Sequence, residues 1–255
     1  MLICLTNVAD AQTNAAGARM GTSSAAGAKM GSSSVQTIAV NRFHKVIISP
    51  YIQARFLEAN EESVTIEDMV VDSNKLHVEV SQNTLRVYLD GAKDIPHYQK
   101  EYGYAHLYPD HAVVITVRYK KMDALSLRGT EKYLCESPLT VSNFRLKLYG
   151  ETTMIFTEVH IGKMRTSIYG ESVLDIRSGE VQRQYYTSYG EGKVYATAIA
   201  GRAAKVTSFG EAEFNVNVSD RIKVAAIGEA RLRYMGNPAI VKGLHIGDMD
   251  LKRLD

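Results

Sequence analysis

The chain has 255 residues, of which 45% are hydrophobic and 23% charged, and its formal net charge is +2. A balance this close to neutral argues against bulk nucleic acid as a partner, because that ligand requires a concentrated positive field. The 2 cysteines are too few for a disulfide-rich scaffold or a four-cysteine zinc site, and no apolar run reaches the length of about 18 residues that a transmembrane helix needs.

The amino terminus is similar to the end of an export signal. Residues 1–8 (MLICLTNV) are apolar and uncharged, and Ala9-Asp10-Ala11 has the small-x-small pattern of a cleavage site. The basic segment that normally precedes the apolar core is missing, as it would be if the start codon were assigned too far downstream. We therefore expect residues 1–11 to be a truncated signal peptide and the protein to be exported, to the periplasm or the cell surface. A disordered apolar N-terminus is the alternative.

A low-complexity segment follows over residues 12–34. The sequence AAGARMGTSS at 15–24 is nearly repeated as AAGAKMGSSS at 25–34. Such Ala/Gly/Ser-rich sequence buries too little apolar surface to offset the entropy of the chain, so we expect a flexible tether. The folded domain is then expected to span residues 35–255, because no further linker interrupts it.

The first part of the folded domain contains irregularly spaced strands. Alternation of apolar and polar residues predicts short strands at 35–40, 43–48, 52–57, 64–66, 76–80, 85–89 and 113–119. Residues 91–110 interrupt this pattern and include Tyr98, Tyr102 and Tyr104. We interpret this segment either as a recognition loop, since tyrosine offers a large contact area at low entropic cost, or as a flap over an exposed sheet edge.

The C-terminal half is dominated by a repeat. Its glycines recur at spacings of 21, 20, 20, 20 and 18 residues, at Gly129, Gly150, Gly170, Gly190, Gly210 and Gly228. Most of them are preceded by an aromatic residue and followed by a glutamate. Even positions counted from each glycine are mainly apolar or small and odd positions carry most of the charge, a period of two that indicates strands. Internal repeats of this length with strand periodicity predict an all-β parallel solenoid.

A single-stranded parallel β-helix accommodates this repeat. About 20 residues at roughly 3.3 Å each give a circuit of about 65 Å, enough for three short faces and their corners, and stacked rungs rise by about 4.8 Å. Equivalent positions then form columns along the rod. At the glycines, the chain either adopts a positive φ angle or lies against the next rung, and the sequence leaves both explanations open.

Two of these columns are candidate binding surfaces. The aromatic column is either an exposed strip for sugar rings or a partner's side chains, or a stacked ladder that stabilises the solenoid; its members are Tyr149, Tyr169, Tyr189 and Phe209. The acidic column is either a cation site, for which calcium is the best candidate, or a polar row neutralised by solvent and by Lys163, Lys193 and Arg231; its members are Glu151, Glu171, Glu191, Glu211 and Glu229. We favour the second interpretation, and no metal site, because the regular glutamates lack the ligand spacing of calcium loops.

The sequence contains no recognisable catalytic motif. Its 7 histidines are scattered, and it has neither a Gly-x-Ser-x-Gly elbow nor a phosphate-binding glycine loop. Some right-handed β-helices are polysaccharide lyases or hydrolases, but these use clustered aspartates with a lysine or arginine on one face. We therefore expect neither catalysis nor a cofactor, with a polysaccharide-active enzyme as the alternative.

Several motifs taken together resemble those of a known protein family. They are Phe43-x-x-Val46-x-Ile48, the pair Leu76-x-Val78-x-Val80 and Leu85-x-Val87, Val113-x-Ile115-x-Val117-x-Tyr119, the glycine repeats, and Tyr234-Met235-Gly236-Asn237-Pro238. Over residues 37–255 the chain is similar to the putative auto-transporter adhesin head GIN domain family, exported proteins common in Bacteroidetes. The resemblance implies a right-handed single-stranded β-helix, an extracytoplasmic location and no established catalytic residues.

From these observations we expect an exported, non-catalytic head domain with an adhesive, ligand-binding or structural role in the cell envelope. The expected partner is a glycan or a protein of the envelope or cell surface, and not a nucleic acid. Open strand edges at the terminal rungs also favour a homo-oligomer.

Overall fold

The computed structural model describes residues 35–93 and 107–255. The expected signal peptide (1–11) and tether (12–34) lie outside the described residues, as does most of the tyrosine-rich segment. The described part forms 19 β-strands and one short 3-10 turn, Ser73–Lys75. It contains no helix that is long and apolar enough to cross a membrane.

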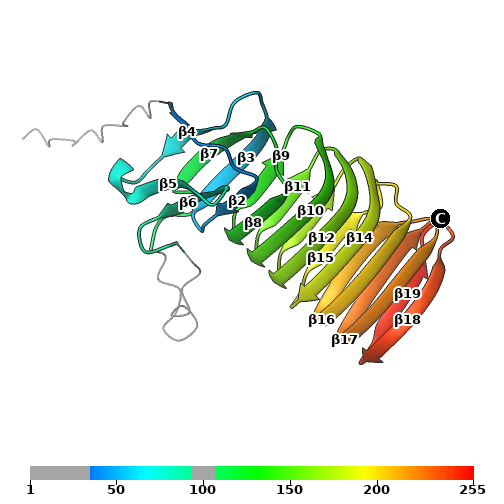
Figure 1. Ribbon diagram of the computed structural model, residues 1–255. Helices are drawn as coiled ribbons and strands as arrows, with labels where there is room; N and C mark the ends of the chain where they lie inside the picture. Colours follow the sequence, from blue (N-terminus) through cyan, green and yellow to red (C-terminus); the bar gives the residue numbers. More distant parts are fainter. Residues whose placement is uncertain (1–34, 94–106) are drawn as a thin grey trace, which may run out of the picture. The chain divides into compact units, whose positions relative to one another are not determined.

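The strands fall into an irregular N-terminal set and a regular C-terminal set. The first set is β1 (Gln36–Ala39), β2 (Lys45–Ile48), β3 (Ile52–Glu58), β4 (Ser63–Met69), β5 (Leu76–Ser81), β6 (Thr84–Leu89), β7 (Val113–Tyr119), β8 (Ala124–Gly129) and β9 (Lys132–Cys135). The second set is β10 (Leu139–Gly150), β11 (Thr153–Phe156), β12 (Val159–Gly170), β13 (Val173–Ile176), β14 (Gly179–Tyr189), β15 (Lys193–Ala196), β16 (Ala203–Asn217), β17 (Arg221–Met235), β18 (Ala239–Ile246) and β19 (Met249–Arg253). In Figure 1 the strands of the second set lie side by side along one axis.

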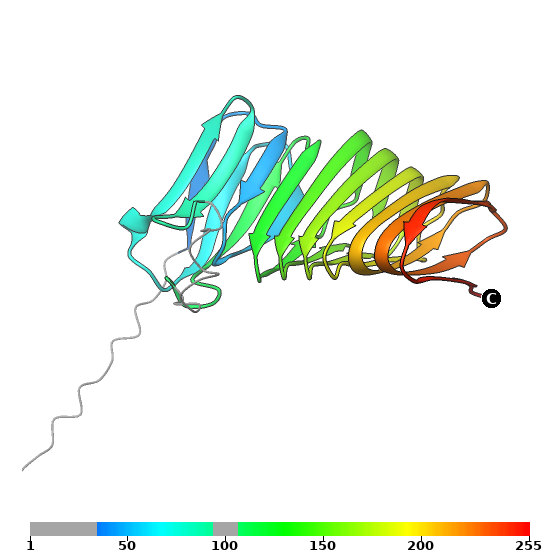
Figure 2. The ribbon, with the colours of Figure 1, turned by 90° about the horizontal axis from the view of Figure 1, so that it is seen from below.

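Parallel pairing at a constant offset shows that the chain winds as a solenoid. β10 pairs with β12 from Leu139 opposite Val159 to Gly150 opposite Gly170, an offset of 20 residues. β12 pairs with β14, and β14 with β16, at the same offset. The predicted all-β parallel solenoid with rungs of about 20 residues is thereby confirmed, and its stacked turns are visible in Figure 2. The right-handed sense of winding stays a prediction.

Each turn buries its apolar side chains from three short segments. In the turn that begins at β12, Ile161 faces inward on the first segment, and Met164 and Ile168 on the second. The alternation slips by one residue between Ile161 and Met164, which marks a corner. β13 is the third segment, with Leu174 inward. Stacked over successive rungs, these side chains form one continuous core, in which each fully buried aliphatic residue contributes roughly 1.5–3 kcal/mol.

The repeated glycines form the corner between the second and third segments. All six have φ angles between 91° and 121°. At Gly170, where φ is 105°, an added Cβ would lie 2.6 Å from the carbonyl oxygen of Gly150 in the preceding rung. The positive φ angle and the close approach of the next rung, which the sequence left as alternatives, therefore both occur at these glycines. Glycine alone adopts this φ without strain, and glycine alone lets the rungs approach this closely.

Replacing Gly170 by alanine should lower the free energy of unfolding by at least about 2 kcal/mol, because backbone strain adds to the clash with Gly150. Urea titration followed by far-UV circular dichroism measures the loss. Gly243→Ala is the matched control, because Gly243 lies outside the left-handed region and the nearest atom to its added Cβ is 3.3 Å away. Equal losses in the two variants would contradict the role assigned to the corner.

The N-terminal strands depart from simple winding. The rung of β2 and β3 lies between the rung of β6 and β7 and that of β8 and β9, so chain order differs from stacking order. β5 pairs antiparallel with β6, β4 with β7 and β1 with β4, which covers this end of the stack. The β5–β6 hairpin turns at Gln82 and Asn83, both at positive φ (48° and 58°), as tight two-residue hairpins require. Antiparallel strands thus protect this edge.

The opposite end of the stack is formed by β18 and β19, which within the described part of the chain pair with β17 and no later strand. β18 places Lys242 opposite Val224 and His245 opposite Ala226. Polar and charged side chains thus occupy positions that are buried and apolar in the rung before. Both side chains are exposed, and charged or polar side chains on an edge strand oppose pairing with another sheet.

One acidic side chain is buried within the N-terminal rungs. Glu131 is 1% exposed and takes the inward position two residues after Gly129. Its Oε1 accepts a hydrogen bond from the backbone N–H of Tyr51 (2.7 Å), and its Oε2 accepts one from that of Thr130 (2.9 Å). Burial raises the pKa of Glu131, although these donors and the nearby His111 act in the opposite direction. The carboxylate holds the turn at Tyr51, whose φ is 68°.

The raised pKa of Glu131 predicts a specific pH dependence. Because the pKa of Glu131 in the folded chain is raised above its ordinary value of 4.5, the folded chain binds the carboxyl proton more tightly than the unfolded chain does. The stability that this group contributes is therefore present at low pH and is lost as the pH rises through the raised pKa. Glu131→Gln removes that loss, so its free energy of unfolding relative to the parent should increase between about pH 4 and pH 7. Urea titrations at both values measure the difference, and a constant difference would contradict the assignment.

Candidate functional site

The predicted aromatic column is continuous along the solenoid. Strand pairing places Tyr149 opposite Tyr169, Tyr169 opposite Tyr189, and Tyr189 opposite Phe209. Successive ring centroids are 4.7, 5.0 and 5.1 Å apart, with interplanar angles of 6°, 5° and 5°. The rings therefore form a stacked ladder just before the glycine corner.

Stacking decides which parts of the rings a partner could touch. Both faces of Tyr169 and Tyr189 are covered by neighbouring rings. The guanidinium carbon of Arg128 lies 5.6 Å from the ring centroid of Tyr149. The ring edges remain open to solvent, since Tyr189 is 44% and Phe209 39% exposed. A sugar ring consequently finds no free face on Tyr169 or Tyr189, and contact with these residues has to be made through ring edges and phenol hydroxyls.

The predicted column of glutamates lies on the other side of the glycine corner. The backbone N–H groups of Glu171 and Glu191 donate to the carbonyls of Gly150 and Gly170, at 2.9 and 3.0 Å, which keeps the column in register. All five side chains are exposed: Glu151, Glu171, Glu191, Glu211 and Glu229. Solvent reduces the repulsion between neighbours to roughly 1 kcal/mol or less per pair.

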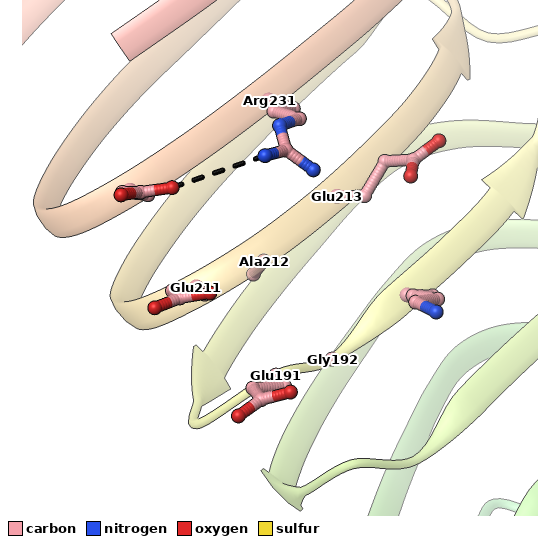
Figure 3. Close-up of a pocket in the computed structure, with 8 residues that line it drawn as sticks. Glu191, Gly192, Glu211, Ala212, Glu213 and Arg231 are labelled. Atoms are coloured by element: carbon pink, nitrogen blue, oxygen red, sulfur yellow. Dashed lines mark ion pairs between the residues drawn. The ribbon is translucent and has the colours of Figure 1, made fainter. Parts of the chain in front are cut away.

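Near the C-terminal end of this column the side chains surround a hollow of about 190 Å³, shown in Figure 3. It is lined by Glu191, Gly192, Lys193, Glu211, Ala212, Glu213, Glu229 and Arg231. Arg231 forms an ion pair with Glu229 at 3.9 Å, marked by the dashed line in Figure 3. Lys193 faces the same hollow, whereas Lys163, the third expected counter-charge, begins the second segment of its turn and lies away from this corner.

Within residues 35–93 and 107–255, no group of three or more His, Cys, Asp or Glu side chains could hold a metal ion. Calcium takes about six to eight oxygen ligands around one point. The glutamate column supplies one carboxylate per rung, and Glu213 adds a second one beside Glu211. Lys193 and Arg231 are the basic groups beside the column. That the column holds no metal ion stays a prediction.

The described ends of the tyrosine-rich segment are fixed to the N-terminal rungs. Tyr108 is 8% exposed and donates from its hydroxyl to the carbonyl of Asp90 at 2.9 Å. Its ring packs edge-on against Tyr51, with centroids 5.7 Å apart. Three candidate binding residues lie outside the described residues, and their recognition role stays a prediction: Tyr98, Tyr102 and Tyr104.

The repeat extends one rung further than the sequence analysis recognised. Gly247 has a φ of 99°, and an added Cβ would collide with the carbonyl oxygen of Gly228. It follows Gly228 by 19 residues and precedes Asp248, so both the spacing and the following acid were available as signals. The aromatic column also continues as two aliphatic residues, Ile227 (42% exposed) and Ile246 (59%). The apolar row thus reaches the last rung.

Tyr169→Ala should lower the free energy of unfolding by roughly 1–3 kcal/mol, because it removes two ring stacks worth about 0.5–1.5 kcal/mol each. Phe209→Ala removes one ring stack and should cost about half as much. Tyr195→Ala is the control, since Tyr195 is 41% exposed and has no ring partner among the described residues. Urea titration measures all three variants, and equal effects would show that the ladder does not stabilise the fold.

Comparisons with solved structures give the same fold. A putative adhesin of Bacteroides fragilis is 19% identical over 86% of this chain and 96% of its own, with a TM-score of 0.71. A putative adhesin of Parabacteroides merdae is 16% identical over 87% and 96%, with a TM-score of 0.63. A putative lipid binding protein of Parabacteroides distasonis is 16% identical over 87% and 96%, with a TM-score of 0.62. None of these structures carries the name of an enzyme.

A search of curated proteins found no match. The profile of one protein family, described as "Putative auto-transporter adhesin, head GIN domain", matches residues 42–238. These residues include the covering antiparallel strands β4 and β5, the aromatic column and the glycine corners up to Gly228. An auto-transporter adhesin is an exported protein. The chain belongs to the auto-transporter adhesin head GIN domain family.

Proposed function

We propose that this protein is an exported, non-catalytic head domain that binds a glycan or a protein of the cell envelope or cell surface. Membership of an adhesin head family supports both export and binding. The parallel solenoid supports binding as well, because a rigid scaffold holds its side chains in place before the partner arrives and so lowers the entropic cost of association. A structural role in the envelope would use the same rod.

The observation that carries this proposal is an exposed apolar row on a rigid corner. We call it the aromatic ridge, and it consists of Tyr149, Tyr169, Tyr189, Phe209, Ile227 and Ile246. Soluble proteins rarely expose contiguous apolar surface without a partner for it. The stacked rings lose little conformational freedom on binding, and the phenol hydroxyls along the same edge add hydrogen-bonding groups.

The glutamate column beside the aromatic ridge adds selectivity. One glycine separates the two columns in each turn, so a partner that covers the ridge also meets a row of exposed carboxylates. A partner edge with basic or hydroxyl groups would be attracted, whereas an acidic edge would be repelled. Charge placed at the rim of an apolar contact chiefly selects partners and sets the rate of encounter.

The hollow beside Arg231 is the observation that favours a polysaccharide-active enzyme as the second candidate. It combines carboxylates with two basic side chains, as such enzymes do, although its carboxylates are glutamates and not aspartates. Glycoside cleavage, however, needs two carboxyl groups that flank the scissile bond from opposite sides. Here Glu191, Glu211 and Glu229 follow one another along a single column. Glu213, the fourth carboxylate of the hollow, lies two residues beyond Glu211 on the same strand and accepts a hydrogen bond from Asn215 at 2.8 Å. No pair of these carboxylates comes from two facing walls, which favours binding over cleavage.

Binding of the full chain to a glycan array and to intact bacterial cells tests the proposal. The double variant Tyr189→Ala/Phe209→Ala removes the two most exposed rings of the aromatic ridge and should weaken binding about tenfold or more. Tyr195→Ala/Val70→Ala is the matched control, because both side chains are exposed and lie off the ridge, at 41% and 62%. Equal binding by the two double variants would contradict the role of the ridge. Release of reducing ends or unsaturated products from an acidic polysaccharide would instead establish an enzyme.

A further inference from the structure

The second segment of each turn presents its odd-numbered side chains on one outer surface of the solenoid. Over five consecutive turns these segments are residues 143–149, 163–169, 183–189, 203–209 and 221–227. Together they carry eight basic side chains, which we call the basic face: Arg145, Lys147, Lys163, Arg165, Arg183, Lys205, Arg221 and Lys223. The same five segments contain no aspartate and no glutamate.

The side chains of the basic face have no acidic partner among the described residues, whereas other surfaces of the solenoid pair their charges. On this face Arg165 makes a cation–π contact with Tyr185, at 5.3 Å from the ring centroid. None of its eight side chains forms an ion pair within the part of the chain that the structure describes. Elsewhere on the regular turns, basic residues have acidic neighbours within reach: Arg177 pairs with Asp175 at 3.2 Å and Arg202 with Asp220 at 2.9 Å. The separation of charge is therefore a property of this face and not of the whole surface.

Like charges also face one another across the strands of the basic face. Arg145 lies opposite Arg165, and Lys205 opposite Lys223. Cross-strand pairs of like charge destabilise a sheet, and nothing in the core requires them, because these side chains point outward. Solvent reduces this repulsion as it does in the glutamate column. The basic face differs in that its like-charged pairs have no acidic partner over residues 35–93 and 107–255, so its positive potential would attract an anion.

The side chains that lie beside the cations restrict the class of partner that fits this face. A column of hydroxyl groups, Ser167, Thr187 and Thr207, lies between the basic columns and the aromatic ridge. Cations and hydroxyls therefore recur together at about the rung spacing of 4.8 Å, over a length of roughly 19 Å for five rungs. A linear polymer with regularly repeated anionic and hydroxyl groups matches this pattern.

We propose that the basic face binds a linear acidic polysaccharide laid along the solenoid axis, with its acidic groups on the arginine and lysine columns and its hydroxyls on the serine and threonine column. This inference rests on the binding role proposed above and names a partner class for it, at a surface different from the aromatic ridge.

Other polyanions fit less well. Single-stranded nucleic acid is bound by stacking bases on free aromatic faces. The rings of Tyr169 and Tyr189 are covered on both faces by their neighbours. Tyr185, which lies among the basic columns, is half-buried, and the guanidinium carbon of Arg165 lies 5.3 Å from its ring centroid. An anionic membrane that reached the aromatic ridge would also meet the exposed glutamate column, which lies one glycine further along each turn. The glutamates would repel such a membrane. A polysaccharide strand that follows the basic columns avoids those carboxylates.

Isothermal titration calorimetry of the full chain with polygalacturonate tests the inference, with dextran as the uncharged control. Polygalacturonate should bind and dextran should not. Raising the sodium chloride concentration from about 50 to about 300 mM should weaken binding roughly tenfold or more, because the contacts are ionic.

Variants locate the site. Arg183→Gln/Lys205→Gln should weaken polygalacturonate binding about tenfold. Lys132→Gln/Lys252→Gln removes the same charge from exposed outward positions on β9 and β19 and should leave binding nearly unchanged. Both side chains of each pair point away from the core, so far-UV circular dichroism should show that both variants fold.

Two results would overturn the inference. One is the absence of binding, or an equal loss in the two double variants. The other is equally tight binding to single-stranded DNA or to phosphatidylglycerol vesicles, which would show general attraction of polyanions. The variant Tyr189→Ala/Phe209→Ala separates the two proposals, because it should retain polygalacturonate binding. If polygalacturonate binds but this variant still adheres to cells, the aromatic ridge fails and the basic face stands. If adhesion is lost but polygalacturonate never binds, the reverse holds.

Discussion

The close approach of successive rungs at the glycine corner is the constraint on which the rest of this structure depends. The carbonyl oxygen of Gly150 occupies the space that a side chain on Gly170 would need, and the same contact recurs along the column up to Gly247. Any Cβ at this position would push two rungs apart, whereas parallel strands must stay about 4.8 Å apart to keep their hydrogen bonds. The positive φ at the same residue turns the chain from the second segment into the third. Because one residue type satisfies both demands, the corner fixes the offset between turns, and that offset brings equivalent side chains into columns.

Stacking in register multiplies the effect of every side-chain choice. A tyrosine at one outward position gains little, but four aromatic rings in a column each gain a stacked neighbour. The same stacking is unfavourable for charged residues, because side chains of like charge become neighbours in the glutamate column and on the basic face. A net charge of +2 does not reveal this arrangement, because the sum combines a surface without acids and a corner at which glutamates recur from turn to turn. The net charge of a chain describes its surface only when acidic and basic residues are evenly distributed, and in this solenoid they lie on different surfaces.

The parts of the fold that the sequence predicts are those set by local rules. Alternation identifies the strands, and the spacing of the glycines identifies the turn length, because both depend on residues within one rung. The direction of pairing in the N-terminal cap has no such signal, since β1 and β4 alternate like the parallel strands. Only the turn at Gln82 and Asn83 distinguishes the β5–β6 hairpin. The basic face also has no local signal in the sequence. Its members are spread over five turns at odd positions, and they become one surface only when those positions are aligned on the glycines.

The two ends of the stack differ from its sides in how they meet other molecules. Antiparallel strands cover the N-terminal end, and at the other end the exposed Lys242 and His245 lie opposite buried residues of the preceding rung. Both ends are therefore poorly suited to continuing the sheet into another chain. The sides, by contrast, repeat the same groups at every rung. On such a surface each further rung adds one weak contact at a fixed distance from the last, so affinity grows with the length of the partner more than with the strength of any single contact. A rod of this kind is therefore suited to extended, repetitive partners, and it would hold a small molecule only weakly.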